Sequence, residues 1–180
     1  MTSASTYTPI ATQTLGSNTP LVYFNSIPQT YTDLVLQFNG QGTSGIYNNM
    51  TYPYIYFNGD NTSGYYSTTS VLQRNTGSGE TVLTTRNSNA NNLALFLANT
   101  STVFSPNIAH IMNYSNTTTY KTVVARGNGA NGTTSVDGVI FGVGLWRNPA
   151  GITSITVGPN GTSGNFLAGS TFTLYGILAA

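Results

Sequence analysis

The residues that could carry acid–base or metal chemistry are few and widely spaced in this sequence. The carboxylates are Asp33, Asp60, Glu80 and Asp137, and His110 is the only histidine. Hydrolysis by paired carboxylates needs two acids that face one bond, and none of these acids stands in a recognisable motif. Asp33 opens a predicted strand, and the other three lie beside glycines in predicted turns. We therefore expect these acids to serve turns and strand ends.

Nucleophilic and metal chemistry have equally little support. Catalysis by a Ser-His-Asp triad would need His110 aligned with a serine, but the sequence contains no Gly-x-Ser-x-Gly elbow. With one histidine and no cysteine, a His-rich or thiolate metal site cannot form within one chain. The neighbours Ile108 and Met112 favour His110 as a core or interface imidazole. The sequence therefore predicts no enzyme, no metal and no cofactor.

Tyrosine is the one abundant residue type with a binding chemistry of its own. Six tyrosines fall close together in the sequence: Tyr47, Tyr52, Tyr54, Tyr56, Tyr65 and Tyr66. Their rings could stack on sugars, which makes this cluster the best candidate glycan site. Alternatively, tyrosines on a strand pack in the core or at subunit contacts, where the hydroxyl finds a hydrogen-bond partner. Both interpretations stay open.

Composition and length narrow the class of protein. The chain of 180 residues suits one domain, and we expect an N-terminal arm over residues 1–6 and a single β-sandwich domain over residues 7–180. Charged residues make up 5% and the net charge is +1, without a basic cluster, so we expect neither nucleic acid nor membrane as a partner. The N-terminus lacks the basic start and apolar segment of a secretory signal, which predicts synthesis in a cytosol.

The stretch Val136–Arg147 contains the strand around which the rest of the chain is organised. Its residues from Val139 to Trp146 carry no polar side chain, yet the run is too short and too rich in glycine for a membrane helix. We predict a strand covered on both faces, the second face being shallow because it holds two glycines. We expect Trp146 to be a core plug and Arg147 to be a contact with another subunit or another protein, as His110 also could be.

The remaining runs predict further short strands separated by clusters of Gly, Asn, Ser, Thr and Pro. These strands are expected at Thr8–Leu15, Leu21–Ile27, Tyr31–Phe38, Tyr54–Phe57, Tyr65–Leu72, Thr81–Arg86, Asn107–Tyr114, Tyr120–Arg126, Ile152–Val157 and Thr171–Leu178. Asn58 and Gly59 suit a tight turn, so Tyr54–Phe57 and Tyr65–Leu72 should form a hairpin. Asn107–Tyr114 should pair likewise with Tyr120–Arg126. Leu93–Leu97 is either a strand or a short helix.

Many short strands without intervening helices predict an all-β fold, an antiparallel two-sheet sandwich of the jelly-roll-like kind. In Tyr31–Phe38, Leu34, Leu36 and Phe38 share the face expected to point into the core. A closed barrel is the alternative.

Several segments resemble small virion proteins of tailed bacteriophages, notably phages of cyanobacteria. The segments are Asn113–Thr122, Gly144–Arg147, Ile152–Thr156 and Gly169–Ile177, together with Tyr31–Leu36 and Phe57–Asp60. The likeness extends from about Tyr7 to Ile177.

The resemblance implies a jelly-roll-like module on the exterior of the phage particle, with synthesis in the bacterial host cytoplasm. It implies a capsid decoration or cement protein that binds the major capsid protein, stabilises the head and forms a trimer or dimer. The alternative is a tail-fibre or receptor-binding domain that recognises host surface glycans. A fibre usually carries a docking segment or shaft ahead of its tip, whereas this chain is nearly all one domain, so decoration is favoured.

Overall fold

The computed structural model describes residues 6–43, 50–75, 79–99, 103–129, 138–160 and 164–178. Within these ranges the chain forms thirteen β-strands and no helix. The strands are β1 (Tyr7–Thr14), β2 (Val22–Phe24), β3 (Asp33–Gly40), β4 (Met50–Thr51), β5 (Tyr54–Phe57), β6 (Tyr66–Asn75), β7 (Glu80–Ala90), β8 (Ala98–Asn99), β9 (Ser105–Met112), β10 (Lys121–Gly129), β11 (Gly138–Trp146), β12 (Ile155–Gly158) and β13 (Thr171–Ile177).

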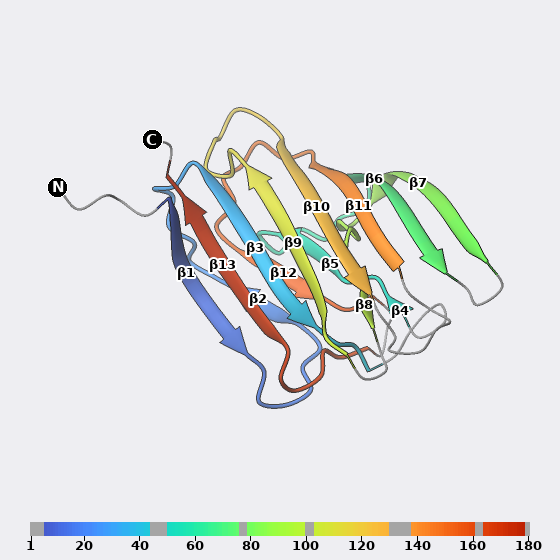
Figure 1. Ribbon diagram of the computed structural model, residues 1–180. Helices are drawn as coiled ribbons and strands as arrows, with labels where there is room; N and C mark the ends of the chain where they lie inside the picture. Colours follow the sequence, from blue (N-terminus) through green and yellow to red (C-terminus); the bar gives the residue numbers. More distant parts are fainter. Residues whose placement is uncertain are drawn as a thin grey trace.

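Eight of these strands form one large sheet in the order β1-β13-β3-β9-β10-β11-β6-β7. Figure 1 shows them side by side, with β1 and β7 at opposite edges. Every neighbouring pair is antiparallel. Side chains therefore alternate between an inner face, toward the second layer, and an outer face.

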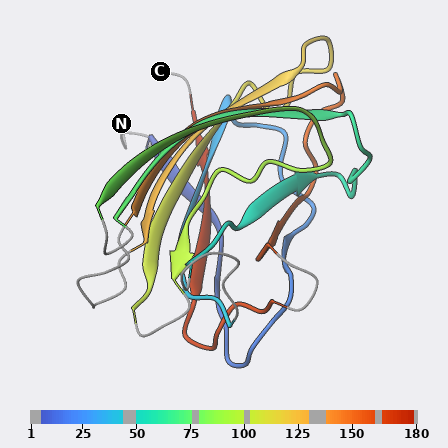
Figure 2. The same ribbon diagram turned by 90° about the vertical axis from the view of Figure 1, so that its right-hand side faces the viewer.

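The second layer contains a three-stranded antiparallel sheet in the order β2-β12-β5 and the short pair β4-β8. Figure 2 shows this layer on one side of the large sheet. The arrangement confirms the predicted fold class, all-β with an antiparallel two-sheet sandwich. The layers are less equal than the jelly-roll-like expectation implied, since one is a sheet of eight strands and the other consists of a three-stranded sheet and a two-stranded pair.

The core lies between the layers and is filled by alternate residues of the large sheet. Leu34, Leu36 and Phe38 of β3 are buried, as the alternation predicted. The Phe38 ring stacks on Phe172 of β13 with centroids 5.3 Å apart. Trp146 is completely buried, which confirms it as a core plug. Of the predicted N-terminal arm, residues 1–5 lie outside the described ranges.

The segment Leu93–Leu97 is neither a regular strand nor a helix. It runs extended beneath β11, and its only strand-like pairing among the described residues is a bridge between Leu93 and Ile55, closed by N–H···O bonds of 2.9 and 3.1 Å. Gly142 and Gly144 make room for it: a Cβ on Gly142 would lie 2.5 Å from Leu95, and one on Gly144 would lie 2.7 Å from Leu93. These glycines therefore set the spacing between the layers.

One predicted hairpin is confirmed and the other is wrong. β9 and β10 pair antiparallel, as expected. The tight turn at Asn58 and Gly59 also forms, with φ of 53° and 70°. The strands that flank it nevertheless belong to different sheets, since β5 pairs with β12 whereas β6 pairs with β11 and β7. The four-residue β5 offers a much shorter ladder than β11, which pairs with β6 from Tyr66 to Arg74.

Candidate interaction surface

The outer face of β11 exposes apolar side chains to solvent. Phe141 is 53% exposed and Val139 is 52% exposed, and Val143 beside them is also open. The sequence predicted that this strand is covered on both faces. That prediction is wrong for the outer face, because the second layer covers only the inner side, where the Leu93–Leu97 segment packs. Three large apolar groups are thus left without a covering layer among the residues that the structure describes.

Neighbouring strands extend this apolar surface. Phe141 lies opposite Val71 of β6, which is also exposed, and Val143 lies opposite Val124 of β10. Cross-strand neighbours on one face lie within about 5.5 Å of each other, so these side chains form a continuous surface. We call Val71, Val124, Val139, Phe141 and Val143 the outer patch.

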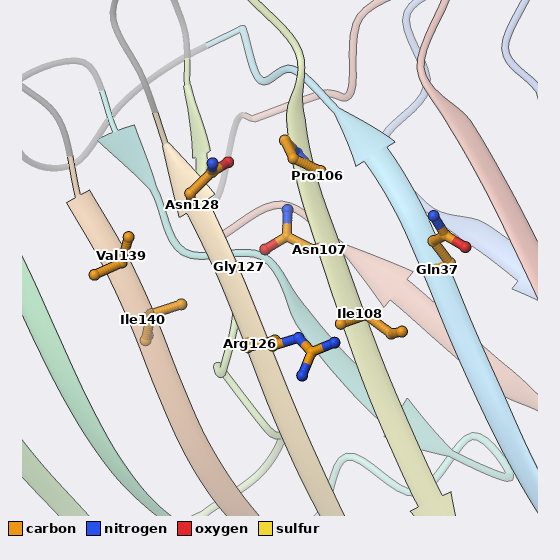
Figure 3. Close-up of a pocket in the computed structure, with 9 residues that line it drawn as sticks. All are labelled: Gln37, Pro106, Asn107, Ile108, Arg126, Gly127, Asn128, Val139 and Ile140. Carbon is orange, nitrogen blue, oxygen red and sulfur yellow. The ribbon is translucent and has the colours of Figure 1, made fainter.

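Arg126 of β10 lies at the border of the outer patch, opposite Phe141 on one side and Ile108 of β9 on the other. Figure 3 shows its side chain extending from β10 toward β9, with Gln37 and Val139 on opposite sides. These residues line a shallow hollow of about 450 Å³. No hydrogen bond or ion pair joins the guanidinium to another residue in the described ranges. The hollow therefore combines apolar walls with an available cation and three amides, of which Gln37 and Asn128 lie on the outer face and Asn107 is already hydrogen-bonded to Leu97 and Ser105.

His110 also lies on the outer face. It pairs across the strands with Val35 and Val124. Its Nε2 is 3.2 Å from Oδ2 of Asp33, and its side chain is 44% exposed. The other oxygen of Asp33 accepts a 2.6 Å hydrogen bond from the backbone N–H of Asn113. His110 is therefore a surface residue, close enough to the outer patch to join the same contact.

Arg147 directly follows β11 and lines a hollow together with Val143 of the outer patch. Its Nη1 donates to the Gly64 carbonyl at 2.6 Å and its Nη2 donates to the Ser88 carbonyl at 3.1 Å. The guanidinium thus ties the loop before β6 to the end of β7. Its predicted role in a subunit or capsid contact stays a prediction, and this geometry gives it a role within the chain.

The six tyrosines predicted as one cluster are dispersed. Tyr66 is completely buried, and its ring stacks on Trp146 with centroids 6.4 Å apart. Tyr52 packs beside Leu72 on the inner side, and Tyr65 is exposed at the end of the sheet. Tyr47 lies outside the described residues. The alternative of core packing thus applies to Tyr66.

Tyr54 and Tyr56 remain together on the outward face of the small sheet. Their rings are nearly parallel, at 20°, with centroids 6.2 Å apart. The Tyr54 ring lies over Gly158, where a Cβ would be 2.6 Å from the phenol carbon and oxygen. Tyr23 of β2 faces the same side, since both Tyr23 and Tyr56 pair with Thr156. Burial raises the pKa of Tyr54, and the nearby Tyr56 and Tyr23 hydroxyls raise it further.

Sequence reasoning missed two features of these surfaces. The alternation of Val139, Phe141 and Val143 was visible, but a continuous apolar run gives no sign of which face lacks a cover. Tyr23 was missed because it comes near Tyr56 only through their common strand partner, Thr156. That partner is distant from both tyrosines in the sequence. Among the described residues no group of three or more His, Asp or Glu side chains could hold a metal ion. The described part of the chain also has no helix long and apolar enough to cross a membrane.

Comparison with known proteins gives little. No family model matches the sequence, and no curated protein matches it. One solved structure with a match is SCP-B, a member of the Eqolisin family of peptidases, in a complex with the tripeptide Ala-Ile-His. The match has a TM-score of 0.20 and 10% identity, and covers 91% of this chain and 65% of that chain.

This match goes against the prediction that the chain is not an enzyme, because the matched structure is a peptidase, and that prediction is withdrawn. A match with this TM-score and identity is also insufficient to show enzymatic activity here, and it carries no argument about the site.

Proposed function

We propose that the protein is a capsid decoration or cement protein of a tailed bacteriophage, which binds the major capsid protein and stabilises the head. The sequence resemblance to small virion proteins supports this proposal. The observation that carries it is the outer patch, an apolar surface on the large sheet that nothing in the described chain covers.

The outer patch suits attachment to a protein shell. Covering exposed apolar surface contributes about 25 cal/mol per Å² buried. A shallow surface spread over β10, β11 and β6 fits a broad partner better than a small molecule, which binds in an enclosed cavity. Arg126 at its border would pair with a carboxylate of the shell, and His110 beside Asp33 would add polar contacts at the rim. Only 5% of the residues are charged. Affinity for the shell would therefore come mainly from shape complementarity and from buried apolar area.

Particle reconstruction of the phage that encodes the chain tests the location. The proposal predicts density over the head lattice in a copy number that follows the repeats of the shell. Density confined to the tail, in few copies, would overturn it.

A binding experiment tests the surface. Phe141→Asp should abolish co-sedimentation of the recombinant protein with empty capsid shells, because it places a charge in the outer patch. Thr14→Asp, on exposed β1 at the far edge of the same face, is the matched control and should bind normally. Equal binding of both variants would show that the outer patch is not the contact.

A tail-fibre or receptor-binding domain that recognises host surface glycans is the second candidate. The observation in its favour is the pair Tyr54 and Tyr56 with Tyr23, since adjacent phenol rings offer apolar faces and hydroxyl groups to a sugar. A glycan array or host lipopolysaccharide binding assay separates the two functions. Binding that is lost in Tyr56→Ala and kept in Phe141→Asp would favour the fibre.

A further inference from the structure

β7 is a long edge strand with little protection. It runs from Glu80 to Ala90 and is exposed on both faces, and Val82 is 63% and Leu83 37% exposed. Its one strand partner in the described ranges is β6, so its other edge presents backbone N–H and C=O groups to solvent. Figure 1 shows β7 at the end of the large sheet. Such an edge is a template for another strand.

β1, at the opposite edge of the sheet, has two protective features that β7 lacks from Glu80 to Asn87. β1 contains Pro9, which has no N–H to donate, and its pairing with β13 is interrupted by a register shift between Pro9 and Ala11. A proline and a bulge are common devices that prevent edge-to-edge association. β7 has no proline, and its pairing with β6 is regular from Glu80 to Asn87. One edge is guarded and the other is available.

The charges of β7 fit a second copy of the same strand. Glu80 and Arg86 are its charged residues, and Leu83 lies midway between them. When two antiparallel copies meet with Leu83 opposite Leu83, Glu80 of each copy lies opposite Arg86 of the other, and Val82 lies opposite Thr84. Glu80 has only a 3.4 Å contact with Gln73, and Arg86 has no polar partner among the described residues.

Other registers are less favourable. Centring the pair on Glu80 places two carboxylates opposite each other, and centring it on Arg86 places two guanidinium groups opposite each other. Like charges directly opposite in an antiparallel pair are destabilising, whereas opposite charges contribute favourably. The register centred on Leu83 forms both ion pairs and also covers Val82 and Leu83.

We propose that two copies of the protein associate through β7, antiparallel and with Leu83 on the two-fold axis. The two large sheets then join into one continuous sheet. In this register, outer-face residues lie opposite outer-face residues, so both outer patches point the same way. This pairing goes beyond the proposed function and does not depend on it. It can be tested on the isolated protein, without phage particles.

Cysteine cross-linking tests the register directly, because the chain contains no cysteine. Leu83→Cys should cross-link to itself under mild oxidation, or a mixture of Val82→Cys and Thr84→Cys proteins should cross-link to each other. Both sets are needed because antiparallel neighbours alternate between narrow and wide pairs, and disulfides require close Cβ atoms. Thr12→Cys on β1 is the control and should stay uncross-linked. The proposal is overturned if neither β7 set reacts, or if Thr12→Cys reacts as readily.

Charge reversal tests the pairing by a second measurement, the dimer Kd from light scattering or analytical ultracentrifugation. Glu80→Arg or Arg86→Glu alone turns two attractive pairs into two repulsive ones and should raise Kd about tenfold. The double variant restores both pairs with reversed sign and should return Kd to near the original value. A strictly monomeric protein, or a double variant as weak as the singles, would refute the proposal.

Discussion

Each face of the large sheet contains some residues of the polarity expected on the other face. The inner face buries polar groups, among them Asn107 and Lys121, within the core. The outer face presents Val71, Val139 and Phe141 to solvent. An antiparallel sheet with one solvated face normally alternates apolar inside and polar outside. The departure on each face therefore needs its own cause.

Asn107 and Lys121 of the inner face both make hydrogen bonds within the chain. Asn107 Oδ1 accepts from the Leu97 N–H at 3.0 Å, and its Nδ2 donates to the Leu97 and Ser105 carbonyls. Lys121 Nζ donates to the carbonyls of Thr119 and Pro149, and burial lowers the pKa of this ammonium. The apolar groups of the outer patch have no such use. Inner polar residues thus serve folding, whereas outer apolar residues are available for association.

The largest difference between the faces is expected at two aromatic residues of β11. Trp146→Ala should lower the free energy of unfolding by about 3–5 kcal/mol, since it empties a filled core site. It also removes the 2.9 Å hydrogen bond from Nε1 to Oδ2 of Asp60. Phe141→Ala should change stability by less than about 0.5 kcal/mol in the monomer. Guanidinium unfolding of both variants measures the contrast, and equal losses would contradict it.

A polar pair sharpens the comparison. Asn107→Ala should cost about 2–4 kcal/mol, because the N–H and C=O groups of Leu97 lose their partner in the core. Asn128→Ala, on the exposed face of β10, is the matched control and should be near neutral. Chemical denaturation at neutral pH provides the measurement. A neutral Asn107→Ala would show that water or a repacked chain satisfies Leu97 equally well.

Tyr66 is a buried hydroxyl whose loss is expected to show in the pH dependence. Its oxygen accepts from the Phe57 N–H at 3.0 Å and donates to the Asp60 carbonyl at 2.7 Å, so Tyr66→Phe should cost about 1–2 kcal/mol at neutral pH. Burial raises the pKa of Tyr66 above its ordinary value. Above pH ~10 the unfolded chain therefore releases a proton that the folded chain keeps, and the free energy of unfolding falls as pH rises.

Tyr66→Phe should make this alkaline loss of stability shallower, and thermal unfolding between neutral pH and about pH 11 measures it. Part of the slope should remain, because burial also raises the pKa of Tyr54 and of Tyr114. Tyr65→Phe removes an exposed hydroxyl and is the control. An alkaline slope equal to that of the unchanged protein would refute the assignment.

Much of the fold followed from local alternation in the sequence. Strands such as β3 and β13 were predictable because one face of each fills the core, and the β9–β10 hairpin because its strands are neighbours in the chain. Pairing across layers was not predictable. The turn at Asn58 and Gly59 is a good hairpin turn, yet β6 leaves it to pair with β11. The turn residues fix the local backbone conformation. The strand that offers β6 the longer ladder of hydrogen bonds, β11, becomes its partner.

The candidate surface was harder to predict than the fold. Tyr66 and Tyr54 both lie in predicted strands with a second tyrosine nearby, but one fills the core and the other lies over Gly158 on an exposed sheet. Which residues of an apolar strand are covered depends on where the second layer ends. Sequence alternation assigns residues to two faces, and only the three-dimensional arrangement shows which face is open.

The smallest expected effect concerns Asp60, whose carboxylate accepts a hydrogen bond from the Trp146 indole. Burial opposes the ionisation of Asp60, but hydrogen bonds from Trp146, Thr62 and Asn148 outweigh it and hold the pKa of Asp60 below its ordinary value. The ionised group therefore stabilises the fold above pH ~4, and this contribution is lost as pH falls through the lower folded-state pKa. Asp60→Asn keeps an acceptor for Trp146 and should flatten the acid limb of the stability profile with little change at neutral pH. Acid unfolding curves that coincide for Asp60→Asn and the unchanged protein would show that the hydrogen bonds do not depend on the charge.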